Sequence, residues 1–127
     1  MKILAGVLFL AVEVFAGKHE FEKYPFWELK MSTRDTLRWI EIKDVDSTGT
    51  LHVEVLQVKR SKTWQPIKAL QAHLAIRRPA LEKSVRKNIK RRPMYPETFD
   101  AAYYQWKAGG GHEICETSVE ECLGSPP

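Results

Sequence analysis

The apolar positions in the first half of the chain predict short β-strands. Aromatic and aliphatic residues dominate residues 26–31 and 37–42, which we expect to form the first two strands. In residues 51–55 apolar and polar side chains alternate, a pattern typical of a half-buried strand. Residues 46–49 separate the second strand from the third, and Gly49 supplies the backbone freedom that a tight turn requires. The second and third strands therefore predict a hairpin.

A fourth strand and a first helix are expected next. Apolar and polar residues alternate again in residues 70–76, although alanines weaken the strand pattern. Pro79 suits the first position of a helix, and apolar residues recur at four-residue spacing through residues 81–89. Pro93 is expected to end this helix, because proline cannot continue the hydrogen-bond pattern.

A second helix is predicted after Pro96. Acidic residues near its start favour the positive end of the helix dipole. Three glycines at positions 109–111 are expected to terminate it. Its apolar stripe consists of Phe99, Ala102, Tyr103 and Trp106.

The tail contains both cysteines of the chain, Cys115 and Cys122. One local disulfide is the simplest pairing in an oxidising compartment. A redox-active pair would need only two intervening residues, and a zinc site would need two further ligands, with only His112 close by. Ser118 and Glu121 form a capping box that predicts a brief turn of helix before Cys122.

This order of elements predicts the α+β class. We expect an antiparallel sheet of about four strands, covered on one face by two helices, with a disulfide-closed C-terminal tail. The 127 residues suffice for one domain and are too few for two ordinary ones.

The first sixteen residues predict a cleaved export signal. Lys2 gives a positive start, residues 3–15 are almost wholly apolar, and Ala16 is a small residue suited to cleavage before Gly17. Glu13 fits this interpretation poorly, and the alternative is a buried N-terminal segment that stays on the protein. The apolar run is too short to span a bilayer. We therefore expect a single domain of residues 17–127 in the periplasm or the secreted fraction.

Charge is unevenly distributed along the chain, whose formal net charge is +4. Residues 77–92 contain eight basic residues and one acidic residue, whereas residues 93–127 contain six acidic residues and one lysine. The basic segment indicates either an anion-binding helix face or an ordinary solvated face. Nucleic acid is not an expected partner, because this segment lacks aromatic residues. The candidate binding residues are Arg86, Lys87, Lys90 and Arg91.

A second hypothesis places a metal or acid–base site at His52, Glu54 and His73. His52 and Glu54 are two residues apart on one predicted strand, so they point to the same face, and His73 reaches them if its strand pairs there. The alternative is that these residues form the polar outer face of a half-covered sheet. No nucleophile motif or phosphate-binding loop is present, so no cofactor is expected.

Aromatic residues are numerous for a chain of this length. Trp39 and Trp106 fall on predicted core faces, and one of Tyr103 and Tyr104 must point outward because they are adjacent on a helix. Trp64 falls in a predicted loop, where exposure would suit a contact with protein or glycan.

Six short stretches carry a resemblance to known proteins: residues 64–68, 73–76, 80–81, 84–85, 95–97 and 115–122. In these stretches the chain resembles a family of small exported proteobacterial proteins grouped as a domain of unknown function. That resemblance implies no activity, catalytic residue or cofactor. We therefore expect a non-enzymatic domain that binds an envelope protein or an anionic glycan, with the His52, Glu54 and His73 site as the enzymatic alternative.

Overall fold

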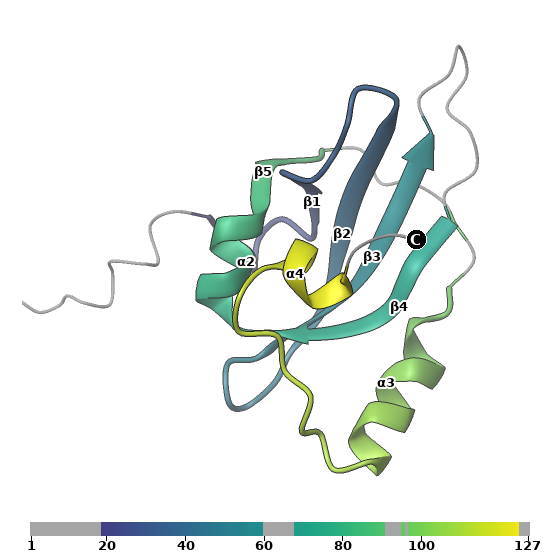
Figure 1. Cartoon of the computed structure of the whole chain (residues 1–127). Helices are drawn as coiled ribbons and strands as arrows, with labels where there is room; N and C mark the ends of the chain where they lie inside the picture. Colours follow the sequence, from purple (N-terminus) through teal and green to yellow (C-terminus); the bar gives the residue numbers. More distant parts are fainter. Residues whose placement is uncertain (1–18, 60–67, 91–94, 96, 125–127) are drawn as a thin grey trace, which may run out of the picture.

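A computed structural model describes residues 19–59, 68–90, 95 and 97–124. Within these residues the chain forms one sheet and three helices (Figure 1). In chain order the elements are β1 (Phe26–Leu29), β2 (Thr36–Val45), β3 (Leu51–Lys59), β4 (Lys68–Ile76), α2 (Arg78–Ser84), β5 (Val85–Asn88), α3 (Phe99–Ala108) and α4 (Val119–Leu123).

The sheet confirms the α+β class but has five strands rather than about four. Its order is β4-β3-β2-β1-β5, and each neighbouring pair is antiparallel. The predicted hairpin of β2 and β3 is present, with Thr36 opposite Lys59 and Val45 opposite Leu51. Gly49 has a φ of +84° in the connecting turn, a conformation that favours glycine.

The long basic helix predicted from Pro79 to Pro93 is wrong. The helix α2 has only seven residues, and Val85 already has extended dihedral angles. The following residues form β5, which pairs with the edge of β1 and is fixed by the bond from the Lys30 amide to the Ser84 carbonyl. The four-residue spacing of apolar residues suggested one continuous helix, but it is also compatible with a short helix followed by a strand. Leu81 and Val85 pack in one core, and Ile89 packs in the other. Sheet pairing therefore decided the conformation of this segment.

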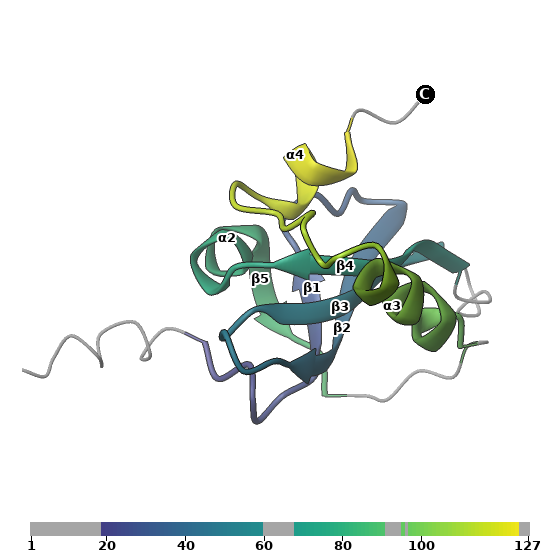
Figure 2. The same ribbon diagram turned by 90° about the horizontal axis from the view of Figure 1, so that it is seen from below.

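Both faces of the sheet are covered, rather than one. The larger core contains Val53 and Val55 of β3, packed against α2 and α4. Side chains at alternate positions point to the opposite face. There, Trp39 and Leu56 belong to a smaller apolar cluster, and His52 contacts α3. Figure 2 shows α2 and α4 on one side of the sheet, with α3 lying away from them next to β4 and β3.

The elements after β5 agree with the sequence prediction. The helix α3 ends just before the glycines at positions 109–111. Ser118 caps α4 by accepting a hydrogen bond from the Glu121 amide, and a disulfide joins Cys115 to Cys122. Cys115 also forms a parallel bridge with Ile76, so the disulfide ties α4 to the end of β4.

Some predictions fall outside the described residues. These are the export signal in residues 1–16, the loop around Trp64, and Arg91, and they remain predictions. Within the ranges that the structure describes, no helix is long and apolar enough to cross a membrane.

Candidate functional site

A group of polar side chains is buried on the sheet face beneath α3. The predicted pair His52 and His73 comes from β3 and β4, and both residues are almost fully buried, with exposures of 0% and 7%. Their expected place on a polar outer face is therefore wrong. The alternation of polar and apolar residues suggested a face open to water. In the structure α3 covers this face with aromatic side chains.

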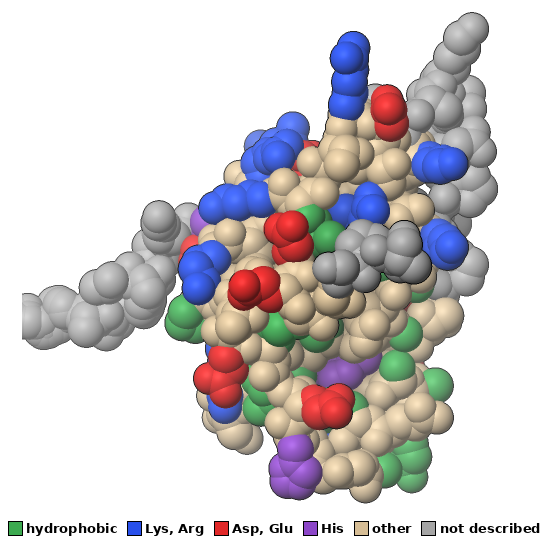
Figure 3. Space-filling view, in the orientation of Figure 1, with side chains coloured by type: hydrophobic (Ala, Val, Ile, Leu, Met, Phe, Trp, Pro, Cys, Tyr) green, Lys and Arg blue, Asp and Glu red, His purple; other side chains and the backbone are tan. Residues whose placement is uncertain are grey.

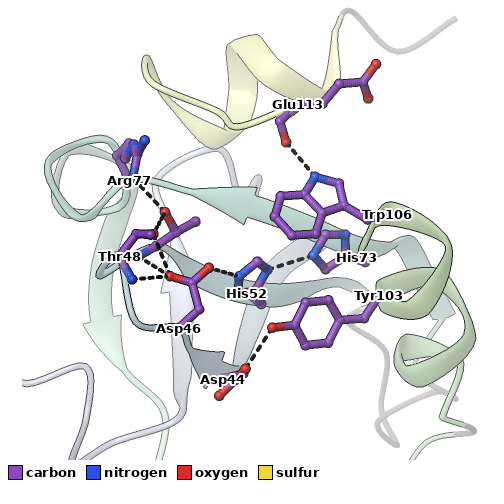
Figure 4. A network of polar contacts seen from close by, with 10 residues as sticks. Asp44, Asp46, Thr48, His52, His73, Arg77, Tyr103, Trp106 and Glu113 are labelled. Carbon is purple, nitrogen blue, oxygen red and sulfur yellow. Dashed lines mark hydrogen bonds and ion pairs between the residues drawn. The ribbon is translucent and has the colours of Figure 1, made fainter. Parts of the chain in front are cut away.

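The two histidines form a hydrogen-bonded chain with a carboxylate (Figure 4). Nε2 of His52 lies 2.7 Å from Oδ2 of Asp46, and Nδ1 of His52 lies 2.9 Å from Nε2 of His73. Because the carboxylate is an acceptor, His52 donates from Nε2. The contact between Nδ1 of His52 and Nε2 of His73 requires that one of these two nitrogens donates and the other accepts.

The turn between β2 and β3 holds Asp46 as an anion. Its Oδ1 accepts hydrogen bonds from the backbone amides of Thr48 and Thr50 and from the Thr48 hydroxyl, at 2.9, 3.2 and 2.6 Å. Partial burial acts against ionisation, but the bonds from Thr48, His52 and Thr50 prevail and hold the pKa of Asp46 well below its usual range. Arg77 donates to the Thr50 hydroxyl and extends this network to the end of β4.

Two aromatic rings of α3 close the histidine pair from solvent. The Tyr103 ring stacks on His52 and His73 at centroid distances of 4.4 and 5.1 Å, and Trp106 packs at 4.9 and 5.3 Å from the same two rings. The Tyr103 hydroxyl donates to Asp44 at 2.8 Å, and the Trp106 indole donates to the Glu113 carbonyl (Figure 4). The histidines therefore lie at the centre of the α3 contact with the sheet.

Burial determines the charge states in this contact. Burial, with a smaller effect of His52, lowers the pKa of His73 to about 4, so His73 is neutral at pH 7. Burial together with the bond to Asp44 raises the pKa of Tyr103 to about 12. A neutral ring stack over a neutral imidazole avoids the cost of placing an unpaired cation beneath the helix.

The structure does not bring Glu54 to the histidines. Its Oε2 accepts a hydrogen bond from the Thr98 hydroxyl at 2.9 Å, and its Oε1 lies 3.5 Å from the Tyr95 hydroxyl. Tyr95 also donates to Glu41, which is directly opposite Glu54 in the sheet. Burial raises the pKa of Glu54, with the Thr98 bond acting in the opposite sense. The predicted triad is therefore a pair, and Asp46 is its carboxylate.

Lys43 neutralises the carboxylates around Tyr95. Its Nζ lies 3.2 Å from Glu41 and 3.3 Å from Glu97. Burial alone would lower the pKa of Lys43, but hydrogen bonds and charge attraction from these two carboxylates raise it. The residues before α3 are thus attached to the sheet by a second polar group, next to the histidine pair.

The histidine pair is built as a brace rather than an open reactive centre. Its inner nitrogens bond to each other and to Asp46, which leaves them no site for a metal ion. Among the residues that the structure describes, no three His, Cys, Asp or Glu side chains are placed to hold a metal. His52 is fully buried, so a substrate could not reach it while α3 is in place. The chain of bonds orients the two imidazole rings, and the packing of Tyr103 and Trp106 on these rings attaches α3 to the sheet.

A basic surface lies at the other end of the sheet. We call it the basic end and define it as Lys30, Lys83, Arg86, Lys87 and Lys90, all exposed. Three of these are candidate residues from the sequence: Arg86 and Lys87 lie on β5, and Lys90 lies just beyond it. Figure 3 shows most Lys and Arg side chains over the upper part of one face, and most Asp and Glu side chains lower down.

Only one residue of the basic end has a charged partner in the described chain. Arg86 donates to Glu28 at 3.1 Å and to the Lys30 carbonyl at 3.2 Å. No described carboxylate lies within ion-pair distance of the four lysines. The register of β5 also shifts beside Arg86, because Val85 pairs with Leu29 and Lys87 with Glu28. Short length, a bulge and positive charge together protect a sheet edge against aggregation.

Comparisons with known proteins add a family to this geometry. A family model described as "Domain of unknown function (DUF5086)" matches residues 3–126. The chain belongs to the DUF5086 family. No curated protein matches it. The predicted membership of a domain-of-unknown-function family is confirmed, whereas export and a bacterial source remain predictions.

The sequence missed several residues of both sites in this DUF5086 domain. Asp46 lies in the predicted turn of residues 46–49 and was not among the candidate residues, although a hairpin brings this turn close to His52 at the start of the next strand. Lys30 is distant in sequence from the other basic residues and joins them only because β1 pairs with β5. Tyr103 was assigned to the apolar stripe of α3, and its ring does face the sheet. The contact of this ring with two histidines was not predicted.

Proposed function

We propose that the protein is a non-catalytic binding module that acts outside the cytoplasm and holds an anionic partner at its basic end. The observation that carries the proposal is the gathering of lysines from the end of β1, from α2 and from the β5 segment, with no described carboxylate paired to them. Unpaired, exposed positive charges attract an acidic protein surface or an anionic glycan over several ångströms.

Two further features support this proposal. A disulfide between Cys115 and Cys122 suits an oxidising compartment. The buried histidine pair is closed by α3, which leaves the exposed charges as the better candidate for contact with other molecules. A binding role also requires a rigid platform, and the five-stranded sheet with two covered faces provides one.

Retention on immobilised heparin and on immobilised poly-glutamate tests the proposal. The informative variant is Lys87→Glu with Lys90→Glu, because Arg86 should stay to neutralise the buried Glu28. The control variant is Lys59→Glu with Lys68→Glu, two exposed positions at the ends of β3 and β4, away from β5. Both variants have the same net charge, so only the location of the charges differs.

We expect the Lys87 and Lys90 variant to elute at much lower salt than the wild-type protein. The control variant should lose far less retention, because it keeps the basic end intact. Equal losses in the two variants would show that net charge alone governs retention and would refute a localised binding surface. Circular dichroism of both variants verifies that the fold is retained.

A further inference from the structure

A small pocket opens beside the basic end. It lies between the end of β1, the last turn of α2 and the first turn of α4, and has a volume of about 210 Å³. Figures 1 and 2 show α4 lying next to α2 over the same side of the sheet. The disulfide between Cys115, beside the end of β4, and Cys122 of α4 links α4 to the sheet next to this pocket.

The floor of the pocket is apolar in character. Leu29 and Val119 are fully buried there, and Ser84 is nearly so. The Ser84 hydroxyl donates to the Ala80 carbonyl at 2.8 Å and accepts from the Val119 amide at 2.9 Å. Because this hydroxyl is satisfied on both sides, the floor favours an aliphatic group over a polar one.

The rim of the pocket contains two cationic side chains. Lys30 and Lys83 line it, are exposed, and have no carboxylate partner among the described residues. Ser118 also lines it and accepts the Glu121 amide, which leaves its hydroxyl proton for another acceptor. Glu120 also lines the pocket. A single anionic group between the lysines is favoured, and a second negative charge near Glu120 is disfavoured.

The volume limits what can enter. Pockets for drug-sized ligands and cofactors measure about 300–1,000 Å³. A space of about 210 Å³ is smaller than that and suits one amino-acid side chain rather than a sugar chain or nucleotide. An apolar floor beneath a cationic rim therefore matches a residue that has an aliphatic side chain and its own negative charge. The last residue of a polypeptide is of this kind.

We propose that this pocket captures the C-terminal residue of a partner protein. The aliphatic side chain contacts Met31, which is partly exposed in the pocket, above the fully buried Leu29 and Val119. The terminal carboxylate lies between Lys30 and Lys83. Recognition of a chain end by its carboxylate is an established mode of peptide binding. This inference rests on the proposed binding function and narrows its partner to a protein with a free, apolar C-terminus.

Titration of the ¹⁵N-labelled full chain with short N-acetylated peptides tests this inference. One peptide ends in leucine with a free carboxylate, a second is its C-terminal amide, and a third ends in aspartate. The free-acid leucine peptide should shift the amides of residues 29–31, 83–84 and 118–120. We expect the amide to bind about tenfold more weakly, because it loses the charge-assisted contacts. The aspartate peptide should also bind more weakly, because of the apolar floor and Glu120.

Matched variants assign the effect to the rim. Lys30→Gln and Lys83→Gln should each weaken the free-acid peptide several-fold and leave the amide unchanged, whereas Lys87→Gln should alter neither. Equal affinity for the acid and the amide, or shifts confined to other residues, would overturn the pocket assignment. Shifts that grow with protein concentration without peptide would assign the pocket to a second copy and also overturn it. Neither result affects the poly-glutamate experiment, which depends on Lys87 and Lys90.

Discussion

Nδ1 of His52 lies 2.9 Å from Nε2 of His73, so two imidazole rings on neighbouring strands bond directly in a region nearly closed to water. Asp46 accepts from the other side of His52, and Tyr103 covers both rings. This arrangement couples the attachment of α3 to the protonation of His73. A proton on His73 would be buried without a carboxylate of its own among the described residues.

The pH dependence of stability should reflect His73. Its folded pKa of about 4 is below the ordinary value of 6.5, so the unfolded chain binds this proton more readily between those values. The contribution of neutral His73 to the free energy of unfolding is complete above pH 6.5. It decreases by at most about 3 kcal/mol as the pH falls towards 4. Urea denaturation at pH 7.5 and pH 4.5 measures it.

The variant His73→Gln serves as the control for this loss. It cannot be protonated, so its free energy of unfolding should change less between the two pH values, although it is less stable at pH 7.5. Asp46 also contributes stability that is lost in acid, but its lowered pKa places that loss below pH 3.8 and outside the measured range. The same slope in wild type and variant would assign the pH dependence to other groups.

Neighbouring tyrosines on α3 should differ sharply in their effect on stability. Tyr103→Ala removes the ring over both histidines and should cost about 2 kcal/mol. Tyr103→Phe loses only the hydroxyl bond to Asp44 and should cost less than about 1 kcal/mol. Tyr104 is 71% exposed, so Tyr104→Ala should change the free energy of unfolding by less than about 0.5 kcal/mol. Comparable losses at both positions would contradict the packing of α3.

These two tyrosines also show what the sequence could and could not predict. Their adjacency on a well-delimited helix required one to face outward, and the glycines after α3 marked its end correctly. The sequence could not show that the inward ring would meet histidines, because His52 and His73 are brought together only by strand pairing. The alternation in β3 was correctly taken as a strand, but a polar residue at an alternate position does not reveal whether a helix will cover it.

The basic segment was misassigned for a related reason. Apolar residues at Leu81, Val85 and Ile89 satisfy a helical period, and positive side chains between them suit a solvated helix face. The free edge of β1 needed a partner, and the segment after Ser84 provides it. The spacing of residues within one segment does not show that a strand distant in sequence has an unpaired edge. The cysteines and the capping box of α4 were predictable because their interactions lie within a few residues of each other.

Neutralising the buried Glu54 should stabilise the protein at neutral pH. Burial raises its pKa above 4.5, so the folded state binds this proton more tightly than the unfolded chain does, and stability falls as the pH rises above 4.5. Glu54→Gln keeps the shape and removes the charge, and should raise the free energy of unfolding at pH 7.5 by about 1 kcal/mol. Glu97→Gln is the control, because its exposed carboxylate contacts the same Lys43 and should contribute little. A loss of stability in Glu54→Gln would show that its bond with Thr98 requires the anion.

Reduction of the disulfide should loosen α4 and weaken the pocket. Cys115 is fixed to β4 by the bonds from its amide to the Ala75 carbonyl, at 2.7 Å, and from the Arg77 amide to its own carbonyl, at 2.9 Å. Cys122 lies on α4, so the bridge keeps the helix that carries Val119 against the core. Closing this short loop stabilises the fold by about 2 kcal/mol. Denaturation with and without dithiothreitol should show that loss, and amide exchange in α4 should accelerate.

The double variant Cys115→Ser with Cys122→Ser should match the reduced protein and be insensitive to the reductant. Unchanged exchange in α4 on reduction would show that packing of Val119 alone holds the helix, and the leucine peptide would then bind equally well in both redox states.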